Sequence, residues 1–159
     1  MDNYKIYLKS KNDYKTINEW SNITDLNNIW KCIDNHEIVV SNKNIDILTI
    51  SSDIFCDIMK NQFWTVNNIS KYIDTINTNS ILRGISNRYK ITILVINHNG
   101  SYKLYDSGEI VIMLYRYNDV QYRHIGLLRN GHVYRYIHKH SYDYEHILER
   151  VLYTGVGIL

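Results

Sequence analysis

Short runs of apolar and aromatic residues, separated by turn residues, fill the chain from residue 90 to residue 138. The runs are rich in Ile, Val, Tyr and Leu, which fit strands well. Asn99-Gly100 and Asn130-Gly131 are strong hairpin signals, because both central residues of a type I′ turn need a positive φ. Since the loops are short, we expect an antiparallel meander. Its five predicted strands are 91–97, 101–105, 109–117, 120–129 and 132–138.

Apolar residues at helical spacing lie on both sides of this region. They predict helices over residues 25–33, 53–61, 66–77, 80–87 and 141–153, and Ser51, Ser52 or Asp53 can cap the second of these. Further short strands are predicted at 4–8, 37–40 and 45–50, with a strand or short helix at 13–20. Strands and helices are segregated along the chain. This pattern predicts an α+β fold, with an antiparallel β-meander of about five strands and helices packed on one face or end.

The composition is that of a globular protein with a sizeable core. Of its 159 residues, 45% are hydrophobic, and no linker or repeat divides the sequence, so we expect a single domain over residues 1–159. The net charge of +2 is too small to indicate a nucleic-acid partner. No apolar run is long enough for a membrane span, and the first residues lack the apolar segment of a signal peptide.

Two cysteines, Cys32 and Cys56, are too few for a disulfide framework. Reduced thiols and a cytoplasmic location are therefore expected. The chain has neither proline nor alanine and is rich in Ile, Asn and Tyr, whose codons are AT-rich. This bias indicates an AT-rich genome, such as that of some large viruses, and bears on origin rather than on activity.

A thiol nucleophile is the first chemistry that the sequence raises. It needs an imidazole to form the thiolate and a third polar group to orient the ring. In addition to Cys32 and Cys56, the chain contains seven histidines that could supply the imidazole. The plainer interpretation of each cysteine is a packing residue, above all for Cys56, which lies within a predicted helix.

The order of elements over residues 52–128 resembles the ovarian tumour (OTU) family of cysteine proteases. The segment SSDIFCDIMKNQFWTVNNISKYIDTI precedes the strand YKITILVI, and a later strand carries His124 followed by apolar residues. The resemblance implies papain-like hydrolysis of a peptide or isopeptide bond, usually at ubiquitin, with no cofactor. It implies His124 as the general base and Cys32 as the nucleophile. The residues around Cys32, WKCID, depart from the acidic-Gly-x-Cys-Leu loop that opens a long helix in the family.

An alternative register places Gln121-Tyr122 where the family has His-Tyr. Glutamine cannot accept and return a proton near neutral pH, so this register predicts an inactive site. The residue that would orient the imidazole is left open. Asn97, Asn99 and Asp119 are the nearby possibilities in the sequence.

Two other candidate sites lie near the C-terminus. Residues His138, His140, Asp143, Glu145 and His146 are metal-ligand types, but their spacing matches no recognised site, so we expect no metal. Tyrosines such as Tyr134 and Tyr136 could stack bases, yet few basic residues accompany them. Tyrosine-rich strands more often cover a sheet face or form a protein interface.

Two function classes follow. The first is an OTU-like cysteine protease or deubiquitinase that uses Cys32 and His124. The second is a non-catalytic module that binds a host or viral protein through the tyrosine-rich sheet. A protein partner is expected in both, and the oligomeric state is left open.

Overall fold

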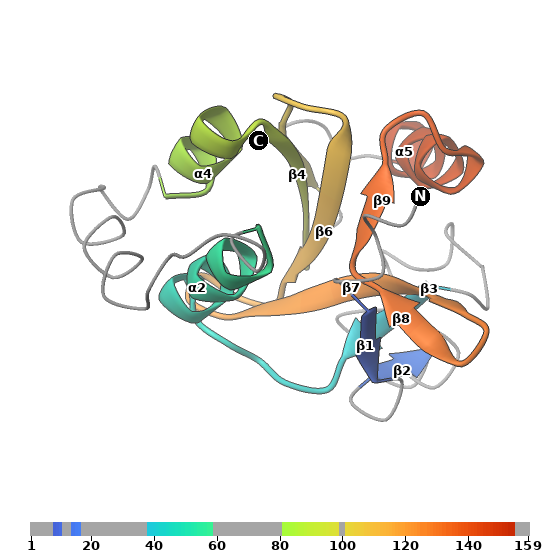
Figure 1. Ribbon diagram of the computed structural model, residues 1–159, viewed down its shortest axis with the longest axis horizontal. Helices are drawn as coiled ribbons and strands as arrows, with labels where there is room; N and C mark the ends of the chain where they lie inside the picture. Colours follow the sequence, from blue (N-terminus) through green and yellow to red (C-terminus); the bar gives the residue numbers. More distant parts are fainter. Residues whose placement is uncertain (1–7, 11–13, 17–37, 59–80, 99–100, 155–159) are drawn as a thin grey trace.

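The computed structural model describes residues 8–10, 14–16, 38–58, 81–98 and 101–154. They form one mixed sheet of nine strands, with helices on both sides (Figure 1). The strands are β1 (Leu8–Ser10), β2 (Tyr14–Thr16), β3 (Ile38–Ser41), β4 (Ile91–Asn97), β5 (Tyr102–Tyr105), β6 (Ile110–Arg116), β7 (Tyr122–Arg129), β8 (His132–Tyr134) and β9 (Tyr136–His138). The helices are α2 (Ile47–Ile58), α4 (Ile81–Tyr89) and α5 (Tyr142–Thr154). The predicted helices over 25–33 and 66–77 lie outside the described residues.

The strands predicted after residue 90 are confirmed in position, with one change. The last of them is interrupted at Arg135, so it forms two strands, β8 and β9, instead of one. The turn at Asn130-Gly131 has φ values of 54° and 79°, as a type I′ hairpin turn requires. The α+β class is also confirmed, because helices pack on a mostly antiparallel sheet.

The prediction of a five-strand meander is wrong. β5 pairs antiparallel with β4, but β6 lies on the other side of β4 and pairs with it in parallel. The loop from β5 to β6 therefore passes the beginning of β4. The Thr92 hydroxyl holds this loop, because it donates to the Gly108 carbonyl at 2.6 Å and accepts from the Ser107 and Gly108 amides at 3.2 Å each.

The helix predicted over 53–61 begins earlier, and residues 45–50 do not form the predicted strand. α2 starts at Ile47, because the Asp46 carboxylate accepts a hydrogen bond from the Thr49 amide at 2.7 Å and so caps the helix. Ile50 and Ile54 then follow at helical spacing and are buried. Ser51, which resembled a cap in the sequence, lies inside the helix and donates to the Ile47 carbonyl.

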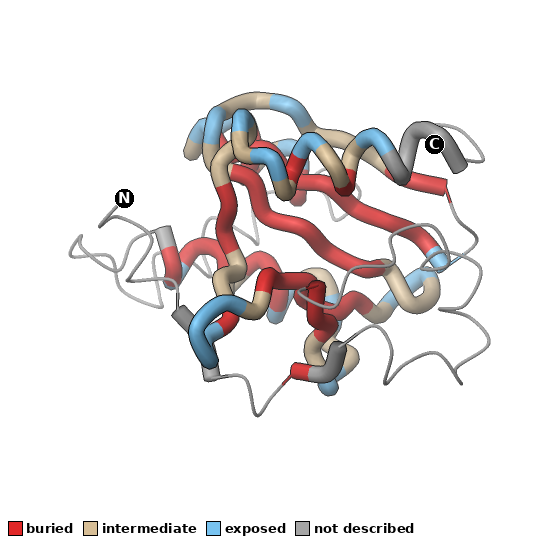
Figure 2. The backbone as a smooth tube through the Cα atoms, turned by 90° about the vertical axis from the view of Figure 1, so that its right-hand side faces the viewer, coloured by how far each residue is buried: buried red, intermediate tan, exposed pale blue. Residues whose placement is uncertain are grey.

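Helices cover both faces of the sheet, not one face or end as predicted. Leu94 and Ile96 of β4 pack in one hydrophobic cluster with Tyr144 and Ile147 of α5. The alternate residues of β4 pack in a second cluster with α2 and α4. β4 is therefore buried along its whole length, which fits a strand whose residues are nearly all apolar. The central strands are enclosed, while the outer sides of the helices are exposed (Figure 2).

β7 joins the part of the sheet that contains β4, β5 and β6 to the part that contains β3 and β8. One edge pairs with β3, and the other pairs first with β6 and then with β8. Ile125 lies at the centre and pairs with both Val40 and Met113. His124, one residue earlier, is consequently flanked by strands and covered by α2, so a polar side chain is placed in the interior.

Candidate functional site

His124 and Cys32 were the two site residues predicted from the sequence. Cys32 lies outside the described residues, so its distance from His124 stays a prediction. His124 lies in the middle of β7 and is only 2% exposed. A buried imidazole with a specific partner is a candidate for a functional group, and also for a structural one.

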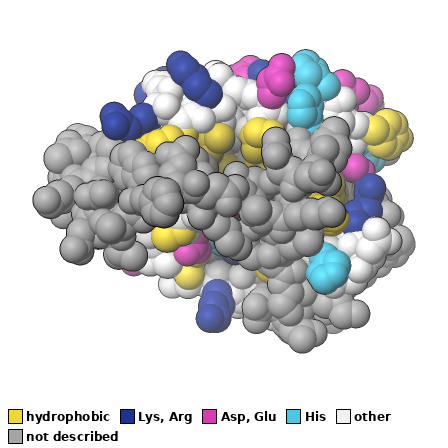
Figure 3. Space-filling view, viewed as in Figure 1, with side chains coloured by type: hydrophobic (Ala, Val, Ile, Leu, Met, Phe, Trp, Pro, Cys, Tyr) yellow, Lys and Arg dark blue, Asp and Glu magenta, His cyan; other side chains and the backbone are white. Residues whose placement is uncertain are grey.

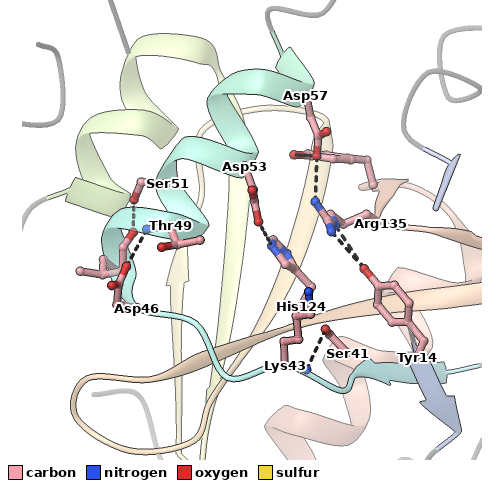
Figure 4. A network of polar contacts seen from close by, with 12 residues as sticks. Tyr14, Ser41, Lys43, Asp46, Thr49, Ser51, Asp53, Asp57, His124 and Arg135 are labelled. Atoms are coloured by element: carbon pink, nitrogen blue, oxygen red, sulfur yellow. Dashed lines mark hydrogen bonds and ion pairs between the residues drawn. The ribbon is translucent and has the colours of Figure 1, made fainter. Parts of the chain in front are cut away.

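The partner of His124 is Asp53, which projects from α2 toward the sheet (Figure 4). The His124 Nε2 and Asp53 Oδ2 atoms are 3.1 Å apart. A carboxylate in this place orients an imidazole, as the third group of a catalytic triad does. Sequence reasoning missed Asp53, because it resembled a helix cap and lies 71 residues from His124.

The nearby candidates for the orienting residue have other partners. The Asn97 side chain donates to the Ser101 hydroxyl at 3.2 Å. The Asp119 carboxylate lies at the surface, 3.9 Å from the Arg116 guanidinium. Asn99 lies outside the described residues. Neither Asn97 nor Asp119 is hydrogen-bonded to His124 in the described structure, whereas Asp53 of α2 is.

Burial lowers the pKa of His124 from 6.5 to about 4; the hydrogen bond with Asp53 opposes this shift and the positive charge of Arg135 adds to it. The imidazole is consequently neutral near pH 7. A neutral ring beside a carboxylate carries its proton on Nε2, which leaves Nδ1 as a hydrogen-bond acceptor. Nδ1 is buried and has no hydrogen-bond partner among the described residues.

The depressed pKa of His124 makes stability depend on pH. The unfolded chain protonates this histidine near pH 6.5, whereas the folded chain resists protonation until about pH 4. Stability should therefore fall as the pH drops through this window, by about 3 kcal/mol from this residue. Urea unfolding of the wild type and His124→Gln at several pH values measures it. Parallel pH profiles for the two proteins would contradict the assignment.

A second polar cluster lies one helical turn along α2. The Asp57 carboxylate accepts hydrogen bonds from Arg135 at 3.2 Å and from the Tyr136 hydroxyl at 2.9 Å. Arg135 also donates to the Tyr14 hydroxyl, so this cluster joins α2 to β2, β8 and β9 (Figure 4). Burial of Tyr14 raises its pKa, although Arg135 opposes the shift. Fully partnered and buried, this cluster holds α2 on the sheet.

A groove lies at the N-terminal ends of α2 and β7. Ile45 and Tyr122 exchange two backbone hydrogen bonds of 2.8 and 2.7 Å, which brings the two starts together. The groove has a volume of about 440 Å³ and is lined by Asp46, Ile47, Leu48, Leu82, Tyr105, Arg116, Asp119, Val120 and Tyr122. Leu48 and Val120 are 45% and 66% exposed. No cysteine or histidine is among these described lining residues.

Tyr134 and Tyr136, which the sequence offered for base stacking or a protein interface, are not exposed. Tyr136 is buried beneath α2, and Tyr134 is half-buried. Both line a separate cavity of about 440 Å³ between the β7–β8 hairpin and the start of α5, where Arg129 and Asp143 form an ion pair. In the described part of the chain, aromatic residues therefore contribute more to the core than to the surface.

The candidate metal ligands near the C-terminus do not form a metal site in the described residues. The His138 and His140 rings are 5.4 Å apart, and His138 faces Glu109 at 3.5 Å. No group of three ligand-type side chains within the described ranges could hold a metal ion. Cys56 lies on α2 and is exposed, so its expected place in the core is not observed.

Among the described helices, none has the length and apolar character needed to cross a bilayer. The chain was also compared with protein-family models, curated proteins and solved structures. None of these comparisons found a match.

Proposed function

We propose that this protein is a non-catalytic protein-binding module with an OTU-like outline, and that the groove between α2 and β7 holds its partner. The observation that supports it is the lining of this groove. Two of the three exposed large hydrophobic side chains in the described residues, Leu48 and Val120, lie in it together. Clustered exposed apolar side chains mark interaction sites more often than scattered ones do.

The arrangement around the groove also favours the inactive register. In the OTU family, which the chain resembles, an acidic-Gly-x-Cys-Leu loop opens a long helix. The described helix that begins next to the start of β7 is α2, and the residue just before it is Asp46, whose carboxylate caps the helix. The residue before β7 is Gln121, whose side chain accepts from Asn118 at 2.9 Å. Neither residue supplies a thiolate or an imidazole.

Selection of displayed random peptides tests the binding function. We expect peptides to be enriched on the wild-type chain and not on a Leu48→Asp, Val120→Asp variant, because the charges would disrupt apolar contact in the groove. Tyr142→Asp, at an exposed tyrosine outside the groove, is the matched control and should select the same peptides as the wild type. Equal enrichment on the groove variant would overturn the proposal.

A second candidate function is a cysteine hydrolase, which one observation favours. His124 is held by Asp53 through Nε2 and leaves a buried Nδ1 without a partner among the described residues. That is the arrangement a thiol of Cys32 would need beside it. In this candidate, Cys32 attacks the carbonyl and His124 serves as base and then acid.

A ubiquitin-based vinyl probe separates the two functions. The non-catalytic module predicts no labelling of the reduced chain. Labelling that is lost in Cys32→Ala and retained in Cys56→Ala would establish the hydrolase. An Asp53→Asn variant should then label at least about tenfold more slowly, because the imidazole loses its orienting carboxylate.

A further inference from the structure

We infer that the groove between α2 and β7 takes an acidic peptide segment that carries aliphatic side chains. This inference rests on the proposed binding function and specifies the chemistry of the partner. Two observations support the inference: the apolar side chains that line the groove and the charged side chains around them.

The apolar part of the groove suits aliphatic side chains. Leu48 projects from the first turn of α2, and Val120 lies in the loop before β7, so they border the groove from two elements. Leu82 of α4 and the Tyr122 ring are buried and form apolar surface between them. A partner side chain that fills this space removes apolar surface from water on both molecules.

Basic side chains surround Tyr105, which lines the groove from the α4–β5 side. The Arg83 guanidinium lies over the Tyr105 ring at 5.6 Å, and the Lys103 ammonium lies 5.8 Å from the same ring centre. Neither cation has a carboxylate partner among the described residues. Lys and Arg side chains are seen over α4, next to hydrophobic side chains (Figure 3).

The groove also contains two acidic residues. Asp46 caps α2, whereas the Asp119 carboxylate is 96% exposed and lies 3.9 Å from the Arg116 guanidinium, which also donates to the Asp119 carbonyl at 3.1 Å. Arg116 is further placed over the Tyr122 ring at 5.9 Å. Three cations, Arg83, Lys103 and Arg116, thus accompany two carboxylates, one of which caps a helix. This balance complements carboxylates rather than a basic segment.

Fluorescence anisotropy with two defined peptides tests this chemistry. The first probe is a labelled 12-residue peptide that alternates Glu with Leu or Ile, and the second has Lys at every Glu. We expect the acidic peptide to bind the full chain at least about tenfold more tightly, since it adds ion pairs to the same apolar contact. Equal affinities, or tighter binding of the basic peptide, would overturn the inference.

Charge reversal locates the contact. Arg83→Glu with Lys103→Glu should weaken the acidic peptide about tenfold or more, whereas Lys43→Glu with Arg88→Glu changes the net charge equally and should leave affinity within about twofold. Val120→Ser should also weaken binding, because it removes apolar contact. Circular dichroism confirms that each variant is folded. If the variant with Arg83→Glu and Lys103→Glu bound the acidic peptide with unchanged affinity, the inference would be wrong.

Two outcomes separate this inference from the function beneath it. If selection yields groove-dependent peptides that are neutral or basic, the acidic preference is wrong while the binding function stands. If no groove-dependent peptide is selected, the binding function itself fails. A single-stranded oligonucleotide that binds more tightly than the acidic peptide, through Arg83 and Lys103, would replace the peptide by a nucleic acid and overturn the inference.

Discussion

Asp57→Ala is expected to lower the free energy of unfolding by about 3–5 kcal/mol, because it leaves the charge of Arg135 buried without its carboxylate. The side chains of Asp57 and Arg135 are only 7% and 11% exposed, so water cannot replace the lost partner. The substitution also removes the acceptor of the buried Tyr136 hydroxyl. Urea denaturation at pH 7 measures the loss.

Asp53→Ala provides the matched control, since it also replaces an aspartate of α2 by alanine, one turn earlier in the helix. Its side chain is 40% exposed and its partner His124 is neutral, so we expect a loss of only about 1 kcal/mol. Adding Arg135→Met to Asp57→Ala should recover part of the loss, because it removes the uncompensated charge. A loss below about 1 kcal/mol in Asp57→Ala would mean that the cluster does not hold α2 in place.

Gly108→Ala is expected to destabilise the fold by about 3 kcal/mol or more, at the upper end of overpacking effects. A Cβ atom at this position would lie 1.7 Å from the Lys90 carbonyl oxygen, which belongs to the backbone and cannot rotate away. Either the β5–β6 loop or the beginning of β4 would have to shift, and the hydrogen bonds of Thr92 with the loop would break. Thermal and urea unfolding both report this effect.

Gly131→Ala separates crowding from backbone strain. Nothing lies within 4 Å of a Cβ at Gly131, but its φ of 79° is one that alanine adopts at a cost. A loss of about 1–2 kcal/mol is therefore expected. If Gly108→Ala cost no more than Gly131→Ala, the close passage of the loop over β4 would be wrong.

The resemblance to the OTU family singled out His124 and left its orienting residue open. His124 was selected because it precedes an apolar run, and it does occupy an exceptional place in the interior of the sheet. The residue that orients the imidazole was sought among Asn97, Asn99 and Asp119, whereas the carboxylate that contacts the ring is Asp53 of α2. The error in the start of α2 hid this residue, because it placed Asp53 at a cap instead of inside the helix.

The groove shows the same limit of local reasoning. Leu48 and Val120 are ordinary apolar residues in the sequence, and nothing near either of them indicates an exposed position. The pairing of Ile45 with Tyr122 brings their segments together. The Tyr105 ring of β5 lies next to Arg83 of α4 and Lys103 of β5. A binding surface assembled from separate elements has no local sequence signal.

The sequence by itself determined the features that depend on neighbouring residues. Apolar runs set the strands from β4 to β7, the Asn130-Gly131 pair set a hairpin turn through its positive φ values, and helical spacing set α4 and α5. The tertiary structure alone decided the parallel pairing of β4 with β6, the burial of His124 against Asp53, and the groove. The physical reason is that these features arise from contacts across the sheet, whose free energy depends on which strands pair.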